Sequence, residues 1–265
     1  MYLWKYWRES RVVFLAGLLL IGLHMAVILS GHIHMTLAMD GPGGASDLRH
    51  PGVADNLRQV TRVLLVFFYI QMAPLGFFAW LIGSFGVGRD LGEGGGSFLF
   101  TRPRRRAAFV WSDWALGLAE VMVMCIFANC AIWMMIHRVL MRMGDPLAGR
   151  LLFGDNAVPL VTAMSMSTAG GILIAALIFS VTYASTVVLR HARGVILSIG
   201  LFVGYLLGGA IVHHYWDAVR FPDLTLHAFT PHGPNTGASW EIAARLAVLL
   251  LFPLLAQLSL ERAEL

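Results

Sequence analysis

The chain has 265 residues, of which 58% are hydrophobic and only 13% are charged, and its formal net charge is +4. The mean hydropathy is +0.72, whereas soluble domains carry about 25% charged residues. This composition excludes a soluble globular protein and predicts an all-α polytopic membrane protein, because long apolar runs favour spanning helices over a barrel. The basic excess suits anionic lipid headgroups, and since no separate basic domain exists, we expect no nucleic-acid partner.

The first ten residues predict a short interfacial element. Leu3, Trp4, Tyr6 and Trp7 share one side at helical spacing, and the opposite side carries charged residues. Two tryptophans beside basic residues are typical of an amphipathic helix lying among the lipid headgroups. A simple juxtamembrane flank of the following span is the alternative. No small-residue cleavage site follows the first apolar run, so we interpret that run as a retained span.

Six apolar runs approach or exceed the ~20 residues that a spanning helix needs. They lie at about 12–31, 63–85, 109–136, 159–188, 194–213 and 242–260, within a single transmembrane domain over residues 1–265. With both termini in the cytoplasm, eleven of the nineteen basic residues fall inside, and the densest basic clusters lie in short inner loops. The positive-inside rule therefore predicts a multi-pass membrane protein with both termini in the cytoplasm.

The connection between the second and third runs, residues 86–107, is broken by glycines and dense in charge. Four arginines occur among the five residues 102–106, after the glycine triplet 94–96. This loop lacks the Gly-Lys-Ser/Thr ending of a nucleotide-binding loop. If the protein performs ATP-driven work, another chain must therefore bind the ATP.

The same loop resembles the cytoplasmic loop of ABC-2 type transporter permeases, the transmembrane subunits of bacterial ATP-binding-cassette exporters. The resemblance rests on an acidic and basic stretch, an apolar stretch and a Pro-x-Arg element, and it extends to the N-terminal residues 4–9 and the six-span layout. The residues that carry it, and that it implies for ATPase coupling, are Arg89, Asp90, Glu93, Gly94, Phe98, Leu99, Phe100, Arg102, Pro103, Arg104 and Arg105. The alternative is that the arginines only follow the positive-inside rule and have no role in coupling.

The resemblance implies a transport subunit with no catalytic site and no bound cofactor of its own. Two ATPase subunits would bind ATP and magnesium, a second permease subunit would complete a homodimer or heterodimer, and the loop would provide a coupling helix. Two features depart from the family pattern. The glycine triplet 94–96 replaces the usual Gly-Thr turn. Family members often have two short apolar re-entrant helices between the fifth and sixth spans, and the polar, proline-containing segment 217–239 favours a reduced form of that feature.

Asp113, Glu120, Gln71 and Asn129 are the polar candidate residues within the apolar runs. Asp113 and Glu120 are seven apart and share one face of the third run. Glu120 lies about 10 Å deeper than Asp113 at 1.5 Å per residue, where an ionisable group is costly unless it is paired, solvated or neutral. We expect Asp113 to pair with the arginine cluster. Glu120 serves either as a gate or substrate contact, or as a hydrogen-bonded link to Gln71 or Asn129.

Small residues and histidines complete the candidate positions. Gly200, Gly204 and Gly208 recur every fourth residue on the fifth run, which predicts close helix packing within or between subunits. His32, His34, His213 and His214 lie near the outer ends of two runs. They are remote candidates for a metal site, and we expect none, because no carboxylate or cysteine has ligand spacing to them.

Two other classes of function compete with transport. A haem- or quinone-linked redox subunit needs histidine pairs inside the bilayer, and only His24 lies well within a run; the visible absorption spectrum distinguishes this class. An intramembrane enzyme could use Asp113 and Glu120, but the sequence offers no obvious nucleophile or metal partner for them.

Overall fold

The computed structural model describes residues 2–39, 74–92, 106–141, 160–215 and 236–262. These residues are helical apart from short turns and include no strand. The named helices are α1 (Tyr2–Met39), α3 (Val87–Gly92), α5 (Arg106–Met141), α7 (Leu160–Val188), α8 (Ala192–Tyr215) and α9 (Thr236–Arg262). A further helical stretch covers Pro74–Gly83 and precedes α3. The prediction of an all-α protein is confirmed for this part of the chain.

Three helices in the described segments are long and apolar enough to cross a membrane. These stretches are Trp4–Val27, Ala107–Cys130 and Thr168–Val188. Pro74–Gly83 and Ala192–Gly204 are shorter apolar helices. The first, third and fourth predicted runs therefore coincide with helices of membrane-spanning character. Part of the second run and the polar segment before α9 lie outside the described residues. The expectation about re-entrant helices falls on that polar segment.

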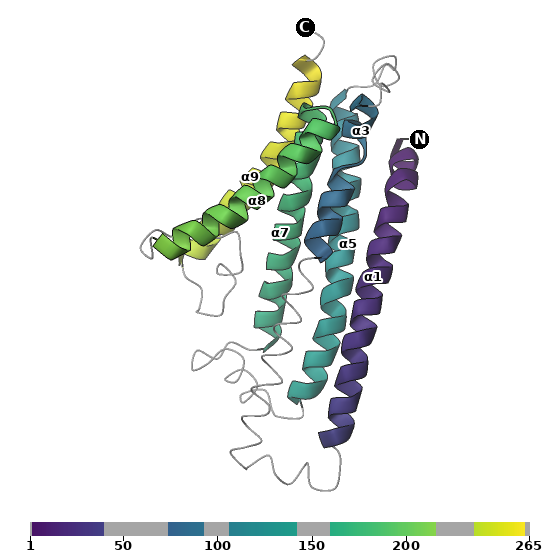
Figure 1. Ribbon diagram of the computed structural model, residues 1–265, viewed down its shortest axis with the longest axis vertical. Helices are drawn as coiled ribbons and strands as arrows, with labels where there is room; N and C mark the ends of the chain where they lie inside the picture. Colours follow the sequence, from purple (N-terminus) through teal and green to yellow (C-terminus); the bar gives the residue numbers. More distant parts are fainter. Residues whose placement is uncertain (1, 40–73, 93–105, 142–159, 216–235, 263–265) are drawn as a thin grey trace.

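Helices α1, α5 and α7 lie side by side, and α9 packs against α7 and α5 (Figure 1). Helix α8 leaves α7 through a tight turn and diverges from α1, α5 and α7 (Figure 1). The first turn of α1, the last turn of α9, short helix α3 and the α7–α8 turn all lie at the same end of the molecule (Figure 1). We refer to this end as the α3 end.

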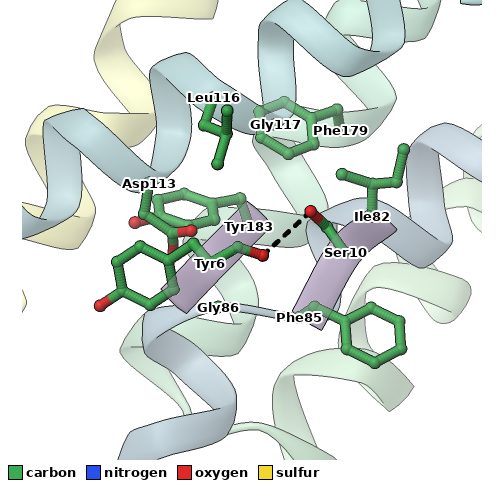
Figure 2. Close-up of a pocket in the computed structure, with 10 residues that line it drawn as sticks. All are labelled: Tyr6, Ser10, Ile82, Phe85, Gly86, Asp113, Leu116, Gly117, Phe179 and Tyr183. Atoms are coloured by element: carbon green, nitrogen blue, oxygen red, sulfur yellow. Dashed lines mark hydrogen bonds between the residues drawn. The ribbon is translucent and has the colours of Figure 1, made fainter. Parts of the chain in front are cut away.

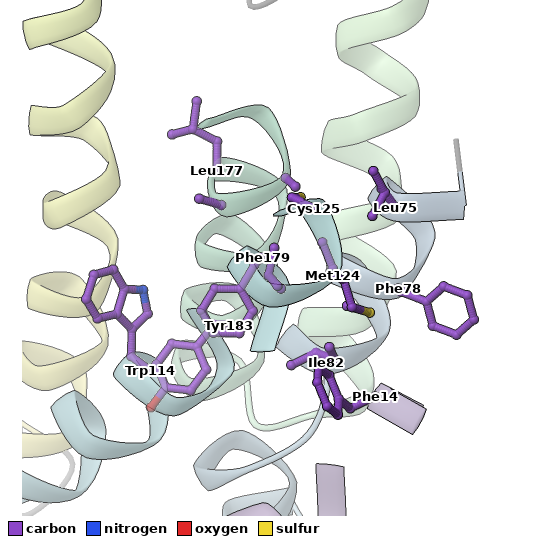
Figure 3. Close-up of a cluster of buried hydrophobic side chains, with 14 of the residues drawn as sticks. Phe14, Leu75, Phe78, Ile82, Trp114, Met124, Cys125, Leu177, Phe179 and Tyr183 are labelled. Atoms are coloured by element: carbon purple, nitrogen blue, oxygen red, sulfur yellow. The ribbon is translucent and has the colours of Figure 1, made fainter. Parts of the chain in front are cut away.

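The core lies where α1, α5, α7 and the Pro74–Gly83 helix meet (Figure 3). Phe14, Phe78, Met124 and Phe179 are buried there. Glycine allows the closest approach: a Cβ on Gly117 of α5 would lie 2.6 Å from the Phe179 ring of α7. Large apolar side chains also cover the outside of the bundle, and Leu19 of α1 is 75% exposed. Apolar residues on both the inner and outer faces of a helix are what a bilayer environment requires.

The N-terminal residues differ from the predicted short interfacial element. Helix α1 runs without interruption from Tyr2 to Met39, so residues 2–10 are its first turns. Tyr6 and Ser10 are only 2% and 7% exposed because they pack into the bundle, while Trp4 is 63% exposed. Burial of one face makes these turns part of the helical bundle.

Candidate functional site

Asp113 of α5 fixes the beginning of α3. Its carboxylate is buried, and Oδ2 accepts a hydrogen bond from the backbone N–H of Val87 at 2.8 Å. Val87 is the first residue of α3, and its N–H is one of the donors that a helix leaves without an intrahelical partner. An acidic side chain at this position also complements the helix dipole. The described contact of Asp113 is thus a helix cap; the side chains of the arginine cluster, with which we expected Asp113 to pair, lie outside the described part of the chain.

Gly86 makes room for this cap. Its φ is +83°, a conformation that side-chain-bearing residues rarely adopt. A Cβ at Gly86 would also collide with the Asp113 carboxylate. The turn before α3 and the carboxylate of α5 therefore fit together only because residue 86 is glycine.

Helix α1 holds α3 through an ion pair. Lys5 Nζ lies 2.5 Å from Asp90 Oδ2 and 3.7 Å from Glu9 Oε1. The Lys5 and Asp90 side chains are 31% and 16% exposed, so the pair is partly shielded from solvent. Asp90 belongs to the predicted coupling set, whereas Lys5 was predicted only as part of a charged helix face.

Helix α7 provides the third contact to α3. A Cβ on Gly88 would lie 2.7 Å from the Thr186 hydroxyl oxygen, so the two backbones pack closely. Thr186 Oγ1 also donates to Tyr183 O at 2.8 Å and lies 3.3 Å from Gly83 O. At the far end of α3, a Cβ on Gly92 would lie 2.7 Å from His191 Cβ. Helix α3 is thus in contact with α1, α5 and α7 and with the α7–α8 turn.

The α7–α8 turn that contacts Gly92 has an unusual backbone. Arg190 and His191 have φ values of +57° and +56°, which non-glycine residues seldom adopt. The His191 N–H donates to Thr186 O at 2.8 Å and closes the end of α7. The predicted runs 159–188 and 194–213 leave a short connection here, but its left-handed backbone could not be predicted, because neither residue is typical of a left-handed helix cap.

A small pocket lies beside the Asp113 cap, with room for about one water molecule. Figure 2 shows the side chains around it, which come from α1, α5, α7 and the segment before α3. Its lining is Tyr6, Ser10, Ile82, Phe85, Gly86, Asp113, Leu116, Gly117, Phe179 and Tyr183. The Tyr183 hydroxyl donates to Val110 O at 3.0 Å. Polar groups from three helices thus converge on one buried space.

Glu120 contacts α1 next to this pocket. Its side chain is 3% exposed, and Oε1 lies 2.6 Å from Ser10 Oγ. Oε2 has no hydrogen-bond partner among the described residues. The predicted link to Asn129 is not made, because Asn129 Nδ2 donates to Cys125 O within α5 at 2.8 Å. Gln71, the other predicted partner, lies outside the described residues.

The remaining predicted coupling residues divide into two groups. Arg89 lies in α3 with its guanidinium 5.7 Å from the centroid of the Phe85 ring. The others lie outside the described residues: Glu93, Gly94, Phe98, Leu99, Phe100, Arg102, Pro103, Arg104 and Arg105. Of the predicted coupling loop, the structure therefore describes the first turns and their attachment to the helices.

The predicted packing glycines lie on an open face of α8. A Cβ at Gly200 or Gly204 would have no heavy atom within 4 Å, so neither packs within the described part of the subunit. Nothing is described of the surroundings of Gly208, nor of the side chains of His32, His34, His213 and His214. Among the side chains that are described, no group of three or more His, Cys, Asp or Glu residues could hold a metal ion.

Comparison with models of protein families, with curated proteins and with solved structures gives no match. The functional interpretation therefore rests on the arrangement of this chain's own residues. Its two central features are the attachment of α3 to three long helices and the buried contact between Glu120 and Ser10.

Proposed function

We propose that the chain is the membrane permease subunit of an ATP-binding-cassette transporter of the ABC-2 type, acting in export across a bacterial inner membrane. Two ATPase subunits would bind ATP and magnesium, and a second permease subunit would complete the transport pathway. The observation that supports this proposal best is the attachment of α3, the first part of the 86–107 loop, to α1, α5 and α7.

This attachment suits a mechanical role for the loop. A partner that pushes on the loop moves α3, and α3 is joined to α5 by the Asp113 cap and to α1 by the Lys5–Asp90 pair. Force applied at the loop therefore reaches three long helices without any covalent chemistry in this chain. Phe98, Leu99 and Phe100 would supply an apolar anchor for the ATPase, and the neighbouring arginines would bind carboxylates around it.

The distribution of charge supports a cytoplasmic position for the α3 end. Five arginines of the helix termini at this end have exposed side chains: Arg8, Arg11, Arg190, Arg193 and Arg262. Basic residues accumulate on the cytoplasmic side of membrane proteins. With this end inside, the 86–107 loop and both chain termini face the compartment that contains ATP.

The test uses the tagged full-length chain, purified in mild detergent from its native host. We expect ATP hydrolysis to co-elute with the wild-type protein. Replacing Phe98 and Leu99 by aspartate should abolish this activity while the chain still enters the membrane, because the apolar anchor is lost. A matched control, Ser97→Asp with Thr101→Asp, adds the same charge to the same loop and should retain it. Equal co-eluting activity in both variants would reject the proposed coupling role.

A further inference from the structure

The Ser10 hydroxyl has one proton and two acceptors within reach. Ser10 Oγ lies 3.0 Å from Tyr6 O and 2.6 Å from Glu120 Oε1. If Glu120 is ionised, the single Ser10 proton can serve the carboxylate or Tyr6 O, but not both. If Glu120 carries a proton, Oε1 donates to Ser10 Oγ and Ser10 donates to Tyr6 O. Only the neutral acid makes both contacts hydrogen bonds at once.

The surroundings of Glu120 also favour the neutral acid. Glu120 is 3% exposed, and Oε2 has no partner among the described residues. Ionised, the group would bury a full charge with a single hydrogen bond, which is costly in a membrane-spanning helix. The titratable groups that line the adjoining pocket are Tyr6 of α1, Asp113 of α5 and Tyr183 of α7, and none of these is a cation. His24 of α1 lies about 21 Å further along that helix than Ser10, at 1.5 Å per residue. Lys5, Glu9 and Asp90 form their own cluster at the α3 end.

The pocket beside Ser10 connects Glu120 to a second buried carboxyl group. Ser10 and Asp113 both line this space, together with Tyr6 and Tyr183 (Figure 2). A space of this size with several polar groups around it suits one bound water. Asp113 is two helical turns closer than Glu120 to the α3 end, where the Lys5–Asp90 pair reaches solvent.

We propose that Glu120 is a proton-binding site within the membrane-spanning part of the chain, and that it exchanges its proton through Ser10 and the adjoining pocket with Asp113. In the exchange, Glu120 Oε1 gives its proton to Ser10 Oγ while the Ser10 hydroxyl proton passes to a water in the pocket. That water passes a proton to Asp113. One proton is displaced and no electron moves. Ionisable side chains within membrane-spanning segments, carboxyl groups among them, serve as proton relays in pumps and transporters.

The first test is infrared spectroscopy of the purified full-length chain in lipid vesicles at neutral pH. We expect a carbonyl band of a protonated carboxylic acid that is lost in Glu120→Gln and retained in Glu261→Gln. Glu261 is an exposed glutamate of α9, so it controls for the same chemical change. Absence of the band from the wild type would overturn the proposal, and so would a band that persists unchanged in Glu120→Gln and disappears in Asp113→Asn.

The second test follows the same band after transfer into deuterated buffer. We expect the isotope shift to develop severalfold more slowly in Ser10→Ala and in Asp113→Asn than in the wild type, because each variant interrupts the route. Unchanged exchange in both variants would overturn the route. Glu120→Gln should fold, since an amide N–H can donate to Ser10 as the neutral acid does. If it does not fold, a frequency shift of the band in Ser10→Ala still tests the assignment, and an unshifted band would contradict it.

Discussion

At the scale of single residues, the two acidic groups of α5 have different tasks. Asp113 accepts the Val87 N–H and fixes α3, and Glu120 contacts Ser10 deeper along the helix. Both residues are buried, at 7% and 3% exposure. A buried carboxyl group that cannot reach solvent needs a hydrogen-bond partner within the protein. Residues of the same chemical type, seven positions apart, thus join α5 to two different elements.

Replacing Asp113 by alanine should destabilise the protein more than replacing it by asparagine. Alanine leaves the buried Val87 N–H without an acceptor, a loss of about 1–3 kcal/mol. Asparagine keeps a side-chain oxygen near the same place. The unfolding free energy in detergent micelles, measured by denaturant titration, checks this order. Equal stability of the alanine variant and the wild type would show that the cap contributes nothing.

Sequence reasoning identified both carboxyl groups but not their partners. The apolar pattern located Asp113 and Glu120 within a run, because charged residues are rare there. Ser10 was overlooked since the first run was predicted to begin at residue 12, which left Ser10 in a flank outside it. Helix α1 begins at Tyr2, and the buried face of its first turns brings Ser10 inside the bundle. Which side chains then meet depends on helix rotation, which hydropathy does not determine.

At the scale of elements, glycines set how closely the helices approach α7. A Cβ at Gly83 would lie 2.7 Å from the backbone oxygen of Phe179, and backbone cannot move aside easily. By contrast, Gly200 on α8 faces open space within the subunit. The close contact at Gly83 determines how near the segment before α3 lies to α7. Gly200 has no such neighbour and does not affect packing within the described part of the subunit.

Gly83→Ala should therefore destabilise the subunit by about 1–3 kcal/mol, as overpacked cores do. Gly200→Ala is the matched control, with the same added methyl group in a helix. It should leave stability unchanged or raise it by about 0.5–1 kcal/mol, because glycine is the weaker helix former. Thermal unfolding of the two variants in the same detergent compares them. A result in the reverse order would contradict the packing described for Gly83.

The elements themselves could be predicted better than their junctions. Long apolar runs such as 109–136 and 159–188 coincide with α5 and α7, because run length alone indicates a spanning helix. The boundary between the N-terminal element and the first run was not predictable, since helix α1 continues through the charged residues around Lys5. The charge of Lys5 is balanced there by Asp90, which lies 85 positions further along the sequence.

At the scale of the whole molecule, the α3 end gathers the features on which the proposed coupling depends. The first turn of α1, the last turn of α9, helix α3 and the α7–α8 turn lie there together (Figure 1). A partner that binds at this end can contact the loop and the termini at once. Because α3 is attached to α1, α5 and α7, the proposed coupling would act on all three helices from this end.

The central claim requires the 86–107 loop to face the compartment that contains ATP. Site-specific labelling of Ser97→Cys in intact cells tests this most directly, after Cys125 and Cys130 have been replaced by alanine. We predict that a membrane-impermeant thiol reagent labels residue 97 only in cells opened by lysis, because the loop lies on the cytoplasmic side. Full labelling in intact cells would place the loop outside, beyond the reach of any cytoplasmic ATPase, and would contradict the account.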